Sequence, residues 1–373
     1  MIHALLVSVM LNCLGHMPFV MRSYSIHEEA KTTDFIAFVT FDNPATSVQD
    51  KVCKFSIKQV LKSPEPLKTL KTIEKTTPLG WAPDKNRALQ FILFADFSSG
   101  KPDVFRLIEA DQETANYVNG VIKAVSQETL LRYCFRYLQH ANEAIAQDAH
   151  IVFSNAASHD LLTARSAYDP VKLRSWLAQK DLKPYRINLY AGLLGLTGNA
   201  GDANLLVALI KQRDQDPFIP LDGCLMGMIL LDKDQGWKLA AEFMQPAKDF
   251  TTRFGVLRAL QTLKEIGHLS STDKDFRHLI DEGLKQEDMI DLYISGLRKW
   301  KIWDYSQKVV SHFQADQGPL LKRSIVQFAL QSPDPNAKAF ITKLRLTDPR
   351  MVEDCEEYLE YEMEKQQRNN PRK

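Results

Sequence analysis

The chain has 373 residues, of which 45% are hydrophobic and 25% charged, and its formal net charge is +1. This composition is that of an ordinary globular protein, and the length fits about two or three domains, or one small domain followed by a repeat array. The near-zero net charge removes the usual electrostatic argument for nucleic-acid binding, which depends on a basic face or a strongly basic domain.

An apolar run, 4–14, lies at the N-terminus. It is short for a membrane span and suits the hydrophobic region of a signal peptide. We assign 1–24 to a signal peptide or apolar N-terminal segment, with a buried first element or an uncleaved anchor as the alternatives. We therefore expect a secreted or periplasmic protein, with a cytoplasmic location as the alternative. No second apolar segment reaches the length of a membrane span.

The cysteines are far apart in the sequence and do not form a C-x-x-C motif of the redox or zinc type. They are Cys13, Cys53, Cys134, Cys224 and Cys355. Cys134 and Cys224 lie in apolar helical stretches, where a free cysteine behaves as a small core hydrophobe. Pairing among Cys53, Cys134, Cys224 and Cys355 stays open.

The segment 25–111 is rich in strand patterns. Alternating or continuously apolar stretches occur at 34–41, 53–58, 68–75, 89–97 and 104–108. Turn residues such as Ser63-Pro64-Glu65-Pro66 separate them. Five short strands with turns between them predict a small antiparallel barrel or sandwich.

These strands resemble a module of bacterial secreted proteins that is similar to the netrin or metalloproteinase-inhibitor barrel of the OB type. The segments that carry the resemblance read TTDFIAFVTF, KFSIKQVLKSPEP, LQFILFADF and DVFRLIEA. The resemblance implies an OB-like barrel. It does not imply protease inhibition, because the chain lacks the N-terminal cysteine pair that the inhibitors use.

Aromatic residues in this module raise a second possibility. OB-type barrels often bind single strands or sugars through aromatics on one face. The candidates for such a face are Phe35, Phe38, Phe55, Phe91 and Phe94. Exposure of Phe35, Phe38 or Phe94 would favour a carbohydrate- or envelope-binding module. A barrel this small must also fill its own interior, and we expect these residues to be core.

Beyond a connector at 112–126, the segment 127–366 shows helical spacing of apolar residues. Helix starts recur at roughly 31 to 37 residues, the period of stacked helix–turn–helix repeats. They lie near Leu189, Gly223, Phe254, Ile290 and Lys322. The sequence predicts an α–α superhelix of about seven helical pairs, followed by a disordered tail at 367–373. The predicted fold class is thus α+β and multidomain.

Two stretches resemble the R-x-x-A-x-x-A-L pattern of HEAT-like repeats. They read TRFGVLRAL at 252–260 and KRSIVQFAL at 322–330. The resemblance implies a HEAT-like α-solenoid. Barrel and solenoid together resemble secreted bacterial proteins of the same two-part layout, and that resemblance implies no activity.

No catalytic, cofactor or metal site is predicted. Gly192, Gly195, Gly198 and Gly201 match neither dinucleotide-binding nor P-loop patterns, so we interpret them as close helix packing and a helix stop. The histidines lack the i, i+4 spacing of two ligands on one helix face, and the chain has no G-x-S-x-G motif.

The best candidate for a partner-binding patch consists of Arg298, Trp300, Trp303 and Tyr305. Tryptophan, tyrosine and arginine are enriched at interface hot spots. The alternative is that the two tryptophans pack between helix layers. We predict a non-catalytic exported scaffold or protein-recognition protein that binds a protein partner on the solenoid surface, and no nucleic acid. An enzyme with a site at the barrel–solenoid interface and a carbohydrate- or envelope-binding barrel are the alternatives.

Overall fold

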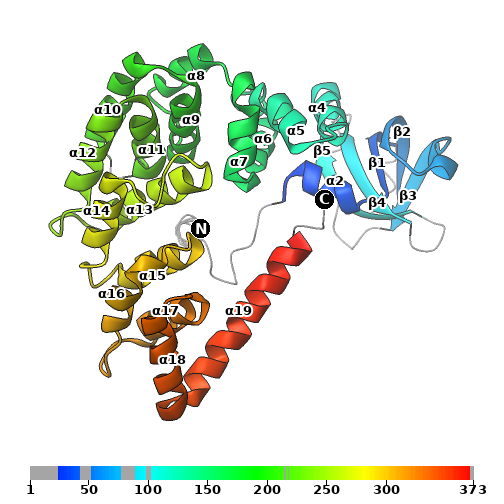
Figure 1. Cartoon of the computed structure of the whole chain (residues 1–373). Coiled ribbons are helices and arrows are strands. Elements are labelled where there is room, and N and C mark those ends of the chain that lie inside the picture. The colour runs from blue at the N-terminus through cyan, green and yellow to red at the C-terminus, as the bar shows by residue number, and fades with distance from the viewer. Residues whose placement is uncertain are drawn as a thin grey trace. The chain divides into compact units, whose positions relative to one another are not determined.

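The structure is a computed structural model that describes residues 24–42, 52–76, 89–97, 102–213, 216 and 218–369. The predicted signal segment, except for its last residue, and the end of the predicted tail beyond 369 lie outside these residues. The chain divides into two compact units, Met1–Ala167 and Tyr168–Lys373. Figure 1 shows the strands in the first unit and only helices in the second.

The first unit contains one antiparallel sheet with the strand order β3-β2-β1-β4-β5. The strands are β1 (Phe35–Phe41), β2 (Val52–Lys62), β3 (Thr72–Thr76), β4 (Gln90–Asp96) and β5 (Asp103–Glu109). The five predicted strands and the α+β fold class are confirmed. Register shifts in the β1–β2 and β4–β5 pairings leave extra residues on β2 and β5, and irregularities of this kind bend strands. Within the described residues β3 and β5 do not pair, so the sheet is an open half-barrel rather than a closed barrel.

Both faces of the central strands β1 and β4 are buried. Phe35 and Phe55 belong to the apolar cluster on one face of the sheet. Phe38 and Phe94 point to the opposite face, because successive strand residues alternate. Phe35, Phe38 and Phe94 are at most 1% exposed. They are core residues, as expected, and do not provide the exposed aromatic face that would favour a carbohydrate-binding barrel.

Two helices of this unit were not predicted. Helix α2 (Ile26–Thr32) begins with a reciprocal capping box between Ser25 and Glu28. Helix α4 (Gln112–Ile122) is capped by Asp111 and packs against α2 and β2. The segment expected to be a connector is therefore mostly helix.

Three further helices complete the first unit: α5 (Gln127–Phe135), α6 (Glu143–Asn155) and α7 (Ser158–Thr163). A short 3-10 helix, Ala164–Ala167, ends the unit. The boundary between the two units thus falls after Ala167, whereas the sequence predicts that the helical domain begins at 127.

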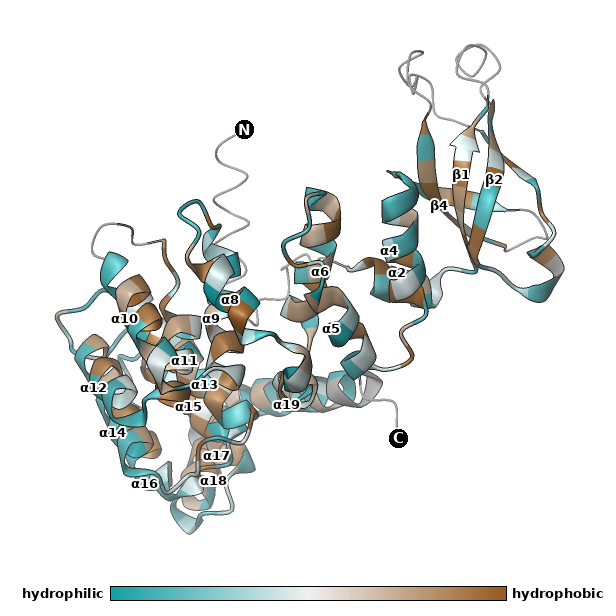
Figure 2. Ribbon diagram, turned by 90° about the horizontal axis from the view of Figure 1, so that it is seen from above, coloured by the Kyte–Doolittle hydropathy of each residue, from teal (hydrophilic) through white to brown (hydrophobic). Residues whose placement is uncertain are grey.

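The second unit consists of alternating helices in two rows, which Figures 1 and 2 both show. One row contains α8 (Pro170–Leu177), α10 (Ala203–Gln212), α12 (Lys233–Phe243), α14 (Lys274–Gly283), α16 (Ser306–Ser311) and α18 (Pro335–Thr347). The other contains α9 (Pro184–Thr197), α11 (Leu221–Leu231), α13 (Phe250–Glu265), α15 (Ile290–Lys299), α17 (Pro319–Gln331) and α19 (Pro349–Asn369). In this second row α11 packs against α9 and α13, and α17 packs against α15 and α19. None of the described helices combines the length and the apolar character that crossing a membrane requires.

Glycines allow the closest approach in this row. A Cβ on Gly195 of α9 would lie 2.5 Å from the Cα of Gly227 of α11, and one on Gly227 would lie 2.7 Å from the carbonyl oxygen of Ala191. Gly198 caps the C-terminus of α9. The interpretation of the glycine series as helix packing and a helix stop is confirmed for Gly195 and Gly198.

Polar contacts connect neighbouring helices of the row at separations close to the sequence period. The backbone N–H of Gly223 donates to Asn188 Oδ1, 35 residues away. Arg258 donates to Asp222, 36 residues away. Arg298 donates to Gln331, 33 residues away. The period seen in the sequence therefore corresponds to real contacts between successive helix pairs.

Candidate functional site

The two tryptophans of the predicted patch are half-buried and pack against other helices of the second unit. The ring of Trp300 meets Phe276 of α14 edge-on, with the centroids 5.3 Å apart. The ring of Trp303 meets Phe328 of α17 in the same way, at 5.1 Å. Edge-on aromatic pairs of this geometry stabilise packing beyond the area they bury. These contacts place both tryptophans in the packing between helices.

The other two residues of the predicted patch are buried. Tyr305 is 5% exposed, and the guanidinium of Arg277 lies over its ring at 4.9 Å. Arg298 is 7% exposed and donates to both carboxylate oxygens of Glu362, at 2.8 and 3.3 Å. Its positive charge is therefore paired with a carboxylate of the same unit. The four predicted residues do not form an exposed surface together.

Helix α19 uses one side for packing. Val352, Cys355 and Leu359 are at most 6% exposed and face α17 and α18, against which the helix packs. Glu362 lies on the same side, since it follows Leu359 and Cys355 by three and seven residues, and it binds Arg298 of α15. The apolar contacts and this ion pair together attach α19 to the row.

The opposite side of α19 is acidic and exposed. Glu353, Glu357 and Glu360 are exposed and follow one another by four and three residues, which aligns them in one stripe. Tyr361 lies beside the stripe and is 60% exposed. Between 349 and 365 the chain has seven acidic and two basic side chains. This face therefore combines negative charge with an exposed aromatic ring.

A second polar centre lies in the first unit, around Asp148 of α6. Its carboxylate accepts hydrogen bonds from the backbone N–H of Ile26 and from the hydroxyl of Tyr117, each at 2.8 Å. The same hydroxyl lies 3.8 Å from the sulfur of Cys134. Burial raises the pKa of Asp148, of Tyr117 and of Cys134 above their ordinary values.

Shifted pKa values often mark catalytic groups, but this cluster is closed. Asp148 is 7% exposed, and Tyr117 and Cys134 are fully buried. The two oxygens of Asp148 are occupied by groups of the protein itself. We interpret the cluster as a structural link that holds the start of α2 against α6.

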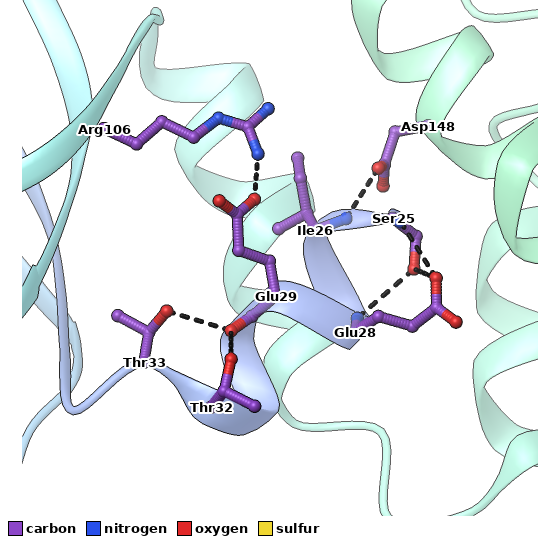
Figure 3. A network of polar contacts seen from close by, with 8 residues as sticks. All are labelled: Ser25, Ile26, Glu28, Glu29, Thr32, Thr33, Arg106 and Asp148. Atoms are coloured by element: carbon purple, nitrogen blue, oxygen red, sulfur yellow. Dashed lines mark hydrogen bonds and ion pairs between the residues drawn. The ribbon is translucent and has the colours of Figure 1, made fainter. Parts of the chain in front are cut away.

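Helix α2 also makes polar contacts with the sheet, on the side that faces away from Asp148, as Figure 3 shows. Glu29 forms an ion pair with Arg106 of β5, while Ser25 and Glu28 lie on the far side of the helix beside Asp148. Lys62 of β2 donates to the carbonyl oxygens of Ala30 and Thr33. Helix α2 therefore connects the sheet to the helices of the first unit.

In the part of the chain that the structure describes, no three histidine, cysteine or carboxylate side chains come together as metal ligands. Comparison with known proteins gave no matching family model, no matching curated protein and no matching solved structure. The geometry of the exposed α19 face is thus the main basis for a functional interpretation.

Proposed function

We propose that the protein is a non-catalytic recognition protein whose second unit, a HEAT-like α-solenoid, binds a Lys/Arg-rich segment of a partner protein on the exposed face of α19. The observation that carries the proposal is the stripe of Glu353, Glu357 and Glu360 with Tyr361 beside it. Since the apolar run at the N-terminus predicts export, we propose that this partner is met outside the cytoplasm.

The solenoid assignment is supported by the contacts between helix pairs. Helices two positions apart in the chain pack against each other, and polar contacts at separations of 33 to 36 residues join them. In such arrays each repeat contacts its neighbours, and the extended surface serves as a binding face.

The choice of a basic partner follows from charge. Complementary charges speed up encounter and select among partners more than they add affinity. The three glutamates of the stripe have no ion pair among the described residues, whereas Glu356 of the same helix pairs with Arg345 of α18 at 2.5 Å. A Lys/Arg-rich segment would neutralise the stripe, with which no side chain in the described part of the chain pairs.

The choice of α19 also rests on its exposed large side chains. Tyr358, Tyr361 and Met363 are 41%, 60% and 50% exposed. Tyrosine and methionine are enriched in the cores of protein interfaces, and tyrosine is a frequent hot-spot residue. A partner segment that covers Tyr361 would bury its ring while its cations meet the glutamates.

The test is affinity capture from the native compartment with the full chain and two variants. The first variant combines Glu353→Gln, Glu357→Gln and Glu360→Gln, and the second is Tyr361→Ala. A partner captured by the wild-type chain should be lost with both, and its retention should weaken with added salt, because exposed charges are screened.

The matched control removes three charges from another surface of the same unit, with Asp234→Asn, Asp275→Asn and Glu287→Gln. These side chains are exposed and lie on or after the helices of the first row. The control should keep the partner. A partner that survives both α19 variants, or that is lost equally with the control, contradicts the proposal.

A further inference from the structure

A cavity of about 240 Å³ lies in the first unit, between α2, α5 and the α6–α7 junction. At roughly 30 Å³ per water molecule, this space corresponds to about eight waters. It can therefore take a ligand of amino-acid size. Its lining includes the buried apolar side chains of Leu130 and Val152, together with acidic and basic groups.

Glu28 and Asp160 supply the negative charge of the cavity. The Oε2 atom of Glu28 accepts hydrogen bonds from the backbone N–H of Ser25 at 3.1 Å and from the amide of Asn155 at 2.9 Å. These bonds fix the carboxylate on the side of α2 that faces away from Glu29 (Figure 3). Asp160 comes from α7; its side chain is 27% exposed, and its Oδ1 atom lies 3.2 Å from Nε2 of the exposed His159. Two carboxylates from different helices thus line one small space.

Lys31 brings a positive charge to the same cavity. It follows Glu28 by three residues and His27 by four, so the three side chains share one face of α2. His27 Nδ1 lies 3.1 Å from the carbonyl oxygen of Val121. Because that oxygen only accepts, Nδ1 carries the proton and donates. Burial lowers the pKa of His27, which favours the neutral ring.

We propose that this cavity binds a free amino acid as its zwitterion. The ammonium group of the ligand interacts with the carboxylates of Glu28 and Asp160, and the carboxylate of the ligand interacts with Lys31 and the amide of Gln127. The side chain of the ligand packs against Leu130 and Val152. A simple amine lacks the group that Lys31 would bind, and a simple carboxylic acid would meet two like charges.

The test uses the full chain and the twenty proteinogenic L-amino acids, screened one by one by thermal shift and measured by calorimetry. At least one should bind, and its N-acetyl derivative and its amide should each bind more weakly. Glu28→Gln and Asp160→Asn should each weaken binding by about tenfold or more, the scale of one lost charge-assisted contact. Glu28→Gln keeps the capping box, because glutamine also serves at that position.

Glu74→Gln, an exposed position on β3, is the control and should leave the affinity unchanged. Circular dichroism of each variant checks that the first unit is folded. No binding by any of the twenty at millimolar concentration overturns the proposal. Binding that Glu28→Gln and Asp160→Asn leave unchanged in folded protein also overturns it. The recognition face on α19 is in the other unit, so either result leaves that proposal unaffected.

Discussion

The carboxylate of Asp148 on α6 accepts a hydrogen bond from the backbone N–H of Ile26, 122 residues earlier in the chain, at 2.8 Å. Ile26 is the first residue of α2, and its N–H is one of those that a helix leaves without an internal partner. The carboxylate of a distant helix thus provides the hydrogen-bond acceptor for the N–H at the start of α2. This bond and the ion pair of Glu29 with Arg106 hold α2 between the helices and the sheet.

The first prediction concerns the pH dependence of this link. Burial raises the pKa of Asp148 in the folded chain, so the folded state holds this proton more tightly than the unfolded state does. The stability that Asp148 contributes through this raised pKa is fully present below its pKa in the unfolded chain, near 3.8. It is lost as the pH rises through the pKa of Asp148 in the folded chain. Each unit of pKa difference corresponds to about 1.4 kcal/mol.

Asp148→Asn removes the titration and keeps the shape, because the amide can accept from Ile26 and donate to the hydroxyl of Tyr117. Urea unfolding between pH 4 and pH 8 should show the free energy of unfolding of the wild type falling relative to that of the variant as the pH rises. Asp103→Asn, at an exposed strand position, serves as the control. Parallel curves for wild type and Asp148→Asn would falsify this assignment.

The second prediction compares two glycines of α9. A Cβ at Gly195 would lie 2.5 Å from the Cα of Gly227, so Gly195→Ala must push α9 and α11 apart. Overpacking of this kind costs about 1–3 kcal/mol. At Gly192 the nearest atom to a new Cβ is the Met226 methyl at 3.5 Å, an ordinary contact.

Gly192→Ala should therefore stabilise the unit by up to about 1 kcal/mol, since alanine favours the helix over glycine. Equilibrium urea unfolding of the two variants should give free-energy changes of opposite sign. Two changes of the same sign would show that the close approach of the helices at Gly195 does not govern the stability of this pair.

The sheet could be predicted from the sequence because its signal is local. Strand residues alternate between two faces, and the strand β2 shows this pattern directly, with Cys53 and Phe55 buried and Lys54 exposed. The helical period could be read for the same reason. Helix α2 was missed although Ser25 and Glu28 have the spacing of a capping box, since it precedes a strand-rich segment and is only seven residues long.

The place of Arg298 could not be predicted from local pattern. It lies in a basic and aromatic segment, which suggested an exposed patch. Its partner, Glu362, is 64 residues away, and only the folded row brings α15 and α19 together. The stripe of α19 lies in a stretch of the chain rich in acidic residues, but which side of that helix packs depends on Val352, Cys355 and Leu359 meeting α17 and α18.

The third prediction concerns the attachment of α19. Glu362→Ala leaves the guanidinium of Arg298 buried without its carboxylate, and breaking a buried pair in this way costs about 3 kcal/mol or more. Glu356→Ala, also on α19, removes the ion pair with Arg345 of α18, and the two side chains are 37% and 50% exposed respectively. This change should cost at most about 1 kcal/mol. Urea unfolding gives both values. Equal costs would contradict the assignment of Arg298–Glu362 as the main polar contact of α19.

The fourth prediction uses the thiols as probes of the same helix. Cys224 of α11 and Cys355 of α19 are free and buried, and burial raises the pKa of Cys224 to about 12 and that of Cys355 to about 11. The reactive thiolate is scarce and shielded in such sites. In the native wild type at pH 8, iodoacetamide should therefore modify both far more slowly than in urea.

Glu362→Ala should accelerate the labelling of Cys355 and leave that of Cys224 unchanged, because local opening of α19 exposes only the first of them. Timed alkylation followed by mass spectrometry of each cysteine peptide measures the two rates separately. Acceleration of both to the same extent would mean that the variant unfolds the whole unit. Rapid labelling of Cys355 in the wild type would mean that α19 is not held on α17 and α18, and the stripe of Glu353, Glu357 and Glu360 would then lose its fixed position on the array.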